Sequence, residues 1–485
     1  MNIKYFELFE YLINEGRCYE FDPGPLHYPI YNFNVKRDGD LGLICETKCK
    51  ANARTNAPTY ELGYLRENFD FITFKLESGF TGVAKGIVPM SVKRSRILES
   101  AENQLTELAY ISEISLQKEV PTSDHYLIEW LANISRNGYV WPEYIDTHEM
   151  LTNRKFNHNT IFLSFSKLLG GDHAGVGCIY MTIGGHEICF GYSDQSDING
   201  KNMPGFIMYA KNSPKEVRDK IRLSMSFIFG RPLIYLGETC FDEKWEVSSL
   251  KAVSPYTNGG QFLKIPHLIQ PTSLNTQLSY NIIETSIFSH QVTAIYEAFD
   301  KYDFKHISNL YWHAVSAPAH TAAVHFGATI EAIQKIYMEF NTSVFNTKLL
   351  KNWNKLMSDI NKVVNNLGVE DLANGGDDIA TVKQLISEKV CKIQNSCNWH
   401  MLIGQLMKNL SLEFGKKERD AWDQRNIVAH GRKTENAKII QQIEEVKTLR
   451  TLCHRILLSM MKISDFYIDY STLGHPIKKL KLPEI

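Results

Sequence analysis

The pattern of apolar and polar positions changes near the middle of the chain. In the first half, short runs rich in aromatic and β-branched residues recur, as at residues 70–76 and 160–165. Such runs are typical of β-strands. Two more runs, at 178–183 and 187–192, flank Gly184-Gly185-His186. Because paired glycines suit the tight turn between antiparallel strands, this stretch predicts a hairpin.

One helix is expected inside this strand-rich half. Pro214 can occupy the first turn of a helix, and apolar residues follow it at spacings of three and four up to Ile228. The pattern therefore predicts a helix over 214–229. The stretch 248–277 is rich in Ser, Pro, Gly, Asn and Thr. Because such residues favour turns and loops, it predicts a linker between two domains.

From residue 278 onward the apolar period is helical. The spacing predicts helices over 290–299, 317–340, 350–367, 401–414 and 416–430, and a long last helix whose apolar stripe runs from Ile439 to Tyr467. The basic tail 478–481 is expected to lie loose. The chain is thus predicted to be α+β. We expect a β-rich regulatory domain over 1–247, a linker over 248–277 and a helical domain over 278–485.

Composition limits the classes of function. The chain has 485 residues and a formal net charge of −1, so any RNA-binding surface must be a local patch. Nine scattered cysteines give no disulfide framework. No apolar run is long enough to span a membrane, and the first residues lack the basic and apolar regions of a signal peptide. These features predict a cytoplasmic protein without a membrane partner.

The most informative motif is Arg425-Asn426-Ile427-Val428-Ala429-His430, followed by Gly431. The Arg425 guanidinium can grip a phosphate with a planar fork of donors, and the His430 imidazole can transfer protons near neutral pH. Asn426 and His430 are four residues apart and share a helix face. The long side chain of Arg425 can reach the same cleft. These groups suit phosphodiester chemistry without a metal or a cofactor.

The reaction that fits them best is cleavage of RNA by its own 2′-hydroxyl, which leaves a 2′,3′-cyclic phosphate. Histidine would move the proton, and arginine would stabilise charge on the phosphoryl oxygens. One histidine cannot easily serve both ends of the displacement, so we expect a homodimer or higher oligomer through the C-terminal helices. Nearby cations predict a phosphate track: Lys416, Lys417, Arg419, Arg432 and Lys433.

The motif, set among C-terminal helices, resembles that of the HEPN ribonuclease superfamily. A β-rich first domain, a linker and a C-terminal helical domain resemble the layout of the ApeA-type anti-phage defence proteins. The resemblance implies a four-to-five-helix bundle and a dimer-built cleft. It also implies abortive infection, in which a phage-encoded trigger releases cleavage of host RNA, with tRNA a candidate substrate. Arg425, Asn426 and His430 carry over as catalytic residues, and Glu331 as a residue that orients or balances Arg425.

Several alternatives remain open. Arg425 and His430 could be a structural pair at a helix end, and Glu331 could be an ordinary solvated or salt-bridged residue. The helical domain could be a non-catalytic adaptor that binds RNA, a nucleotide or a phage protein. A third hypothesis is a zinc hydrolase. It would use Cys45 and Cys49, or the Cys391, Cys397 and His400 set, but neither has a second half with finger-like spacing.

Overall fold

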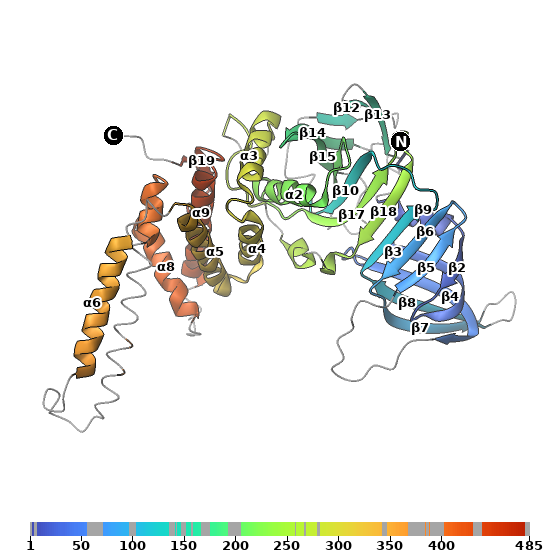
Figure 1. The fold of residues 1–485 in the computed structure, drawn as a ribbon, viewed down its shortest axis with the longest axis horizontal. Helices are drawn as coiled ribbons and strands as arrows, with labels where there is room; N and C mark the ends of the chain where they lie inside the picture. Colours follow the sequence, from blue (N-terminus) through green and yellow to red (C-terminus); the bar gives the residue numbers. More distant parts are fainter. Residues whose placement is uncertain are drawn as a thin grey trace. The chain divides into compact units, whose positions relative to one another are not determined.

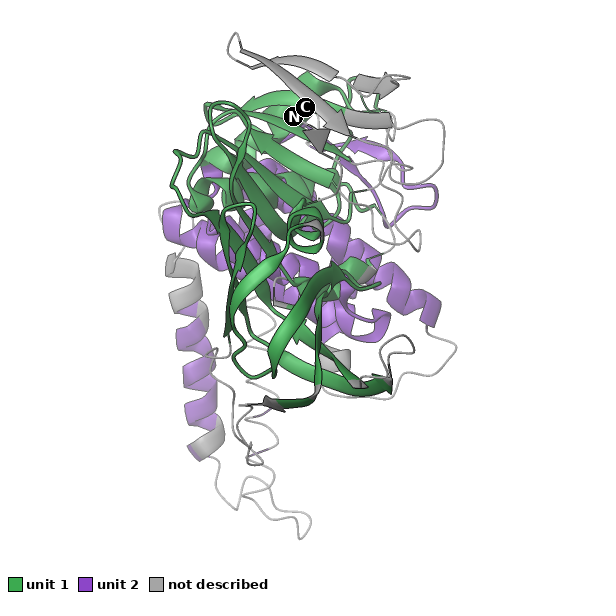
Figure 2. Cartoon of the chain, turned by 90° about the vertical axis from the view of Figure 1, so that its right-hand side faces the viewer, with its two compact units in different colours: residues 1–297 green, residues 298–485 purple. Residues whose placement is uncertain are grey.

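The structure of this chain is a computed structural model, and it divides into two compact units, Met1–Glu297 and Ala298–Ile485 (Figure 2). It describes residues 2–3, 7–55, 71–96, 103–134, 141, 143–146, 152–156, 159–165, 175–192, 205–257, 259–265, 268–278, 282–341, 347–366, 384, 388, 402–429 and 439–480.

The first unit is built on a long antiparallel sheet with the strand order β11-β14-β15-β16-β10-β17-β18-β9-β6-β5-β2 (Figure 1). Its strands are β2 (Cys18–Asp22), β5 (Phe71–Leu76), β6 (Phe80–Lys85), β9 (Glu113–Lys118), β10 (Tyr126–Ala132), β11 (Glu143–Asp146), β14 (Gly175–Ile183), β15 (His186–Tyr192), β16 (Gly205–Tyr209), β17 (Ile234–Phe241) and β18 (Val247–Val253).

A second sheet covers one end of the long one. Its order is β3-β4-β8-β7, with β3 at His27–Arg37, β4 at Leu43–Thr55, β7 at Val88–Arg96 and β8 at Asn103–Ile111. The ring centroids of Phe33 on β3 and Phe74 on β5 are 4.9 Å apart, so aromatic side chains fill the space between the sheets. Helix α1 (Phe9–Glu15) packs on β3.

Smaller elements complete the first unit. A three-stranded sheet joins β1 (Asn2–Ile3), β13 (Asn159–Phe165) and β12 (Thr152–Phe156). Two 3₁₀ turns follow β18, η1 (Pro255–Thr257) and η2 (Gly260–Lys264). The predicted hairpin is confirmed: Ile183 pairs with His186, and Gly184 and Gly185 both have positive φ, as a type I′ turn requires.

Helix α2 (Lys215–Phe229) lies on the long sheet and follows Pro214, as predicted. Its buried residues include Ile221, Met225 and Phe229, and the Phe229 ring meets that of Phe190 on β15 at 5.4 Å. The helix covers one face of the strands beneath it, and every residue of β10 and of β16 is buried.

The second unit is helical. Helices α4 (Phe304–Ser316), α5 (Ala319–Phe340), α8 (Lys416–Ala429) and α9 (Ile439–Met460) pack against one another (Figure 1). Helix α6 (Thr347–Asn366) and a helix over 402–409 lie between α5 and α8 in the sequence. The α+β fold class is therefore confirmed: a β-rich first part is followed by a helical second part. Within the part of the chain that the structure describes, no helix is both long and apolar enough to cross a bilayer.

The predicted domain boundary was wrong. Residues 248–253 belong to β18, which pairs with β17 and β9 inside the long sheet, so the expected linker over 248–277 begins within the sheet. Compact units separate only after Glu297, so that almost all of helix α3 (Thr285–Ala298) belongs to the first unit. Half-buried and buried positions alternate along most of this strand, and composition alone does not reveal this pattern.

Two further differences concern the second unit. Helix α4 was not predicted; it begins after Asp303, whose side chain accepts a hydrogen bond from the His306 amide. The last helix ends at Met460 rather than near Tyr467, because Lys462 takes a left-handed conformation. The chain then forms a hairpin of β19 (Phe466–Ile468) and β20 (Ile477–Lys479), so the tail that was expected to be loose is ordered through Leu480.

Candidate functional site

Helix α8 carries the predicted catalytic motif. At its first turn, the Gly415 amide donates to Glu418 Oε2 at 3.0 Å, and the same carboxylate accepts from Arg455 of α9 at 2.9 Å. One turn later, Ala421 and Trp422 are buried in the core of the unit. These contacts fix the position of α8 on α9 and thereby determine which way its later residues face.

Arg425 follows Trp422 by three residues, which places both on the same side of the helix. The guanidinium carbon of Arg425 lies 3.6 Å from the centroid of the Trp422 ring. Its Nη2 donates to Glu331 Oε1 on α5 at 2.9 Å. The Arg425 side chain is 14% exposed and the Glu331 side chain 48%. A cation–π contact and an ion pair therefore hold the guanidinium in a single orientation near the surface.

A glycine of α5 makes room for Arg425. A Cβ built at Gly327 would lie 2.1 Å from Arg425 Cδ and 2.4 Å from Nη1. Gly327 lies one turn before Glu331, so Arg425 crosses α5 over Gly327 and ends at the carboxylate. Neither Gly327 nor Trp422 was predicted from the sequence. An isolated glycine within a helical pattern was the signal that could have found Gly327.

The other two motif residues are only partly placed. Asn426 lies in α8, but its side chain is outside the described residues. His430 follows Ala429, the last residue of α8, and is itself outside them. The structure thus brings together Arg425 and Glu331, the pair that the sequence suggested, and leaves the position of the imidazole as a prediction.

The cations of the predicted phosphate track also lie partly within and partly outside the described residues. Lys416, Lys417 and Arg419 are exposed in the first turn of α8. Arg419 precedes Arg425 by six residues, or about 9 Å along the helix axis. Lys417 Nζ donates to the Ser471 carbonyl at 2.9 Å, and Arg419 Nη2 to the Phe414 carbonyl at 3.2 Å. Arg432 and Lys433 lie outside the described residues.

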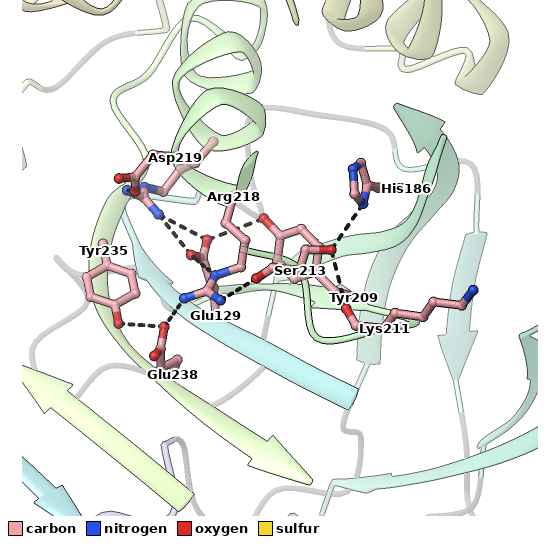
Figure 3. A network of polar contacts seen from close by, with 10 residues as sticks. Glu129, His186, Tyr209, Lys211, Ser213, Arg218, Asp219, Tyr235 and Glu238 are labelled. Carbon is pink, nitrogen blue, oxygen red and sulfur yellow. Dashed lines mark hydrogen bonds and ion pairs between the residues drawn. The ribbon is translucent and has the colours of Figure 1, made fainter. Parts of the chain in front are cut away.

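A second cluster of charged residues lies in the first unit, between α2 and the long sheet (Figure 3). Glu129 of β10 accepts from Arg218 at 3.1 Å and from Arg222 at 3.0 Å. Arg218 also pairs with Glu238 of β17, and Tyr235 donates to Glu238 at 3.0 Å. Burial raises the pKa of Tyr209 and of Tyr235, so both phenols stay protonated. These groups are bonded to one another, which points to a structural role in holding α2 on the sheet.

A buried imidazole lies in the second unit but has no route to a substrate. His454 of α9 is fully buried, and its Nε2 lies 2.7 Å from the Tyr311 hydroxyl. Burial, and then the charge of Arg450, lower the pKa of His454 well below its usual value of 6.5. The ring is therefore neutral and serves the core rather than proton transfer with solvent.

The cysteines of the zinc hypothesis are also placed in part. Cys45 and Cys49 lie on β4 and are buried; burial raises the pKa of Cys45 to about 12 and that of Cys49 to about 11. Cys391, Cys397 and His400 lie outside the described residues. Among the residues that are described, no three His, Cys, Asp or Glu side chains come together as metal ligands would.

Comparison with known proteins adds no relative. A scan against protein-family models found no match, and neither did a search of curated proteins or a search of solved structures.

Proposed function

We propose that the helical unit is a metal-independent endoribonuclease of the HEPN type that acts in anti-phage defence. The observation that supports this most is the fixed orientation of Arg425. Its guanidinium is held by Trp422 at 3.6 Å and by Glu331 at 2.9 Å, five residues before His430. A pre-oriented cation is suited to stabilise the negative charge of a phosphoryl transition state.

In the proposed reaction, the 2′-hydroxyl of RNA attacks the adjacent phosphorus, and the bond to the 5′-oxygen breaks. His430 takes the 2′-hydroxyl proton or protonates the leaving oxygen. Arg425 stabilises the negative charge on the phosphoryl oxygens. The nucleophile belongs to the substrate, so the reaction needs no metal-bound water. Host RNA, with tRNA a candidate, is the proposed substrate, and a phage-encoded protein the proposed trigger.

Self-association is part of the proposal, because two copies of His430 could serve as base and acid. Apolar side chains that remain exposed on α6 and on the first turns of α9 favour it: Leu356, Val363, Ile439, Ile440 and Ile443. Covering such residues in a homodimer would stabilise the assembly. We further propose that the β-rich unit restrains the nuclease or senses the trigger. The protein is proposed to act in the cytoplasm.

One observation favours a second candidate. Because Arg425 is only 14% exposed and already paired, it could serve to lock α8 onto α5. The protein would then be a non-catalytic adaptor that binds RNA, a nucleotide or a phage protein.

The two candidates are separated by incubating the purified full-length protein with total tRNA in EDTA. The nuclease predicts fragments with cyclic phosphate ends that disappear in Arg425→Ala and in His430→Ala. The Lys408→Ala variant serves as the control, because Lys408 is exposed on the helix over 402–409. RNA binding without cleavage would support the adaptor instead.

A further inference from the structure

The segment that follows α9 packs back against that helix and covers Arg450. The Arg450 guanidinium lies 4.3 Å from the centroid of the Tyr470 ring, and the rings of Tyr470 and His475 are 5.0 Å apart. In Figure 1 the β19 strand lies beside α9, as their contacts require. The middle of α9 and the loop between β19 and β20 thus bring a cation, an aromatic ring and an imidazole together.

Arg450 is half-buried and differs from Arg455, on the same helix, in its charge balance. Within the described residues its buried Nε, like that of Arg455, meets no hydrogen-bond acceptor, and no carboxylate pairs with the Arg450 guanidinium. Arg455, five residues later on the same helix, pairs with Glu418 at 2.9 Å and donates to the Glu413 carbonyl at 2.6 Å. Because a guanidinium stays protonated, Arg450 cannot relieve its burial by losing its charge.

A second cation lies on the same helix. Lys447 lies three residues before Arg450, on the same face of α9. Burial lowers the pKa of His475, and the charges of Lys447 and Arg450 lower it further. Asp469, the acid that acts in the opposite direction on His475, already accepts from Lys478 at 2.6 Å and from Ser471 and Thr472. The cluster therefore carries an excess of positive charge.

We propose that Lys447, Arg450 and His475 form a binding site for a phosphate group. An anion at this place would neutralise a half-buried cation to which the described residues offer no carboxylate, and a charge removed from water is stabilised by such a partner. A guanidinium and an ammonium offer charge-assisted donors and an imidazole offers one more, which suits an anion with several acceptor oxygens, such as a phosphate. All three side chains are only partly buried, so a solute can reach them.

The phosphate could belong to a free nucleotide or to the backbone of RNA. Both present the same oxygens to the cluster, and the proposal holds for either source. It does not depend on RNA cleavage, since Arg450 packs on Tyr470 and Arg425 on Trp422 and Glu331. A protein that fails to cut RNA could still bind phosphate here.

The test is the effect of inorganic phosphate on the full-length protein, measured by thermal unfolding and by the NMR signal of His475, with sodium chloride at equal ionic strength as reference. The wild type should show a saturable rise in unfolding temperature. Removing one donor in Lys447→Gln or Arg450→Gln should weaken the apparent affinity about tenfold or more, as expected for a charge-assisted hydrogen bond. Lys408→Gln should bind like the wild type.

The outcomes separate the sources. If a single-stranded oligoribonucleotide also loses affinity in these variants, the site takes the RNA backbone; if only inorganic phosphate does, it takes a free phosphate compound. Should Arg450→Gln fail to fold, Lys447→Gln and His475→Gln carry the test. No phosphate-specific stabilisation of the wild type, or an equal effect in all variants, would overturn the proposal.

Discussion

Gly327 of α5 lies under the side chain of Arg425 of α8, so close that a Cβ at position 327 would meet Arg425 Cδ at 2.1 Å. The relationship is specific, because even the smallest addition at 327 must displace the arginine. A substitution at Gly327 can therefore shift the guanidinium while Arg425 itself is kept. Such a variant tests whether cleavage depends on the orientation of Arg425 and not only on its presence.

We therefore predict that Gly327→Ala reduces RNA cleavage strongly. Misplacement by about 1 Å can cost on the order of 100-fold in rate. The variant should keep its helical circular dichroism, because alanine favours a helix. Gly404→Ala is the matched control: a Cβ there meets nothing within 4 Å, and it should raise stability by about 0.5–1 kcal/mol without changing cleavage. Full activity of Gly327→Ala would show that the orientation of Arg425 is irrelevant.

Glu331→Gln tests whether the carboxylate does more than form an ion pair. Because Glu331 is 48% exposed, its loss should cost less than about 1 kcal/mol in the free energy of unfolding. If Glu331 orients Arg425, the rate of cleavage should nevertheless fall. Glu339→Gln, an exposed position on the same helix, should change neither quantity. Unchanged cleavage in Glu331→Gln would leave Glu331 as an ordinary surface residue.

The buried cluster of the first unit should respond differently. Glu129→Gln leaves Arg218 and Arg222 without a carboxylate that both of them use, so it should lower the free energy of unfolding by about 3–5 kcal/mol. Glu246→Gln removes an exposed partner of Lys118 and should cost less than about 1 kcal/mol. Urea unfolding of both variants makes the comparison. A small loss in Glu129→Gln would contradict the structural role of the cluster.

His454 should make stability depend on pH. Folding lowers the pKa of His454 well below its usual value of 6.5. At a pH below 6.5, the unfolded chain therefore binds a proton at His454 more readily than the folded chain does. The contribution of the neutral His454 ring to the free energy of unfolding is therefore fully present above pH 6.5. It is lost as the pH falls from 6.5 toward the pKa of His454 in the folded protein. For this one proton the slope approaches about 1.4 kcal/mol per pH unit. Urea unfolding between pH 5 and 7.5 should show a weaker slope in His454→Gln than in the wild type.

The sequence predicted those parts of the fold in which the apolar spacing is regular and a proline or glycine marks the end of the element. The α2 helix after Pro214, the glycine turn at 184–185 and α8 between Gly415 and Gly431 follow such signals. It failed where apolar spacing fits two structures. Ile463 and Tyr467 continue the stripe of α9, yet a left-handed Lys462 turns the chain into a hairpin. A residue other than glycine in that conformation gives no warning in the sequence.

The sequence predicted which residues carry the chemistry of the candidate site, but not which residues hold them in position. Arg425 and Glu331 are 94 residues apart, and the motif and its resemblance suggested their pairing. The support given by Gly327 and Trp422 depends on how α5 crosses α8, which local pattern does not encode. The linker was misplaced for a related reason: the polar residues of β18 resemble those of a loop, and pairing with β9 and β17 decides their structure.

Cleavage of tRNA in EDTA by the full-length wild type, Arg425→Ala and His430→Ala tests the central claim most directly. The account predicts fragments with 2′,3′-cyclic phosphate ends from the wild type alone, with both variants folded and at least about 100-fold slower, as expected when a group that stabilises or protonates the transition state is removed. Equal cleavage by all three proteins, or none by the wild type in the presence of its trigger, would contradict it.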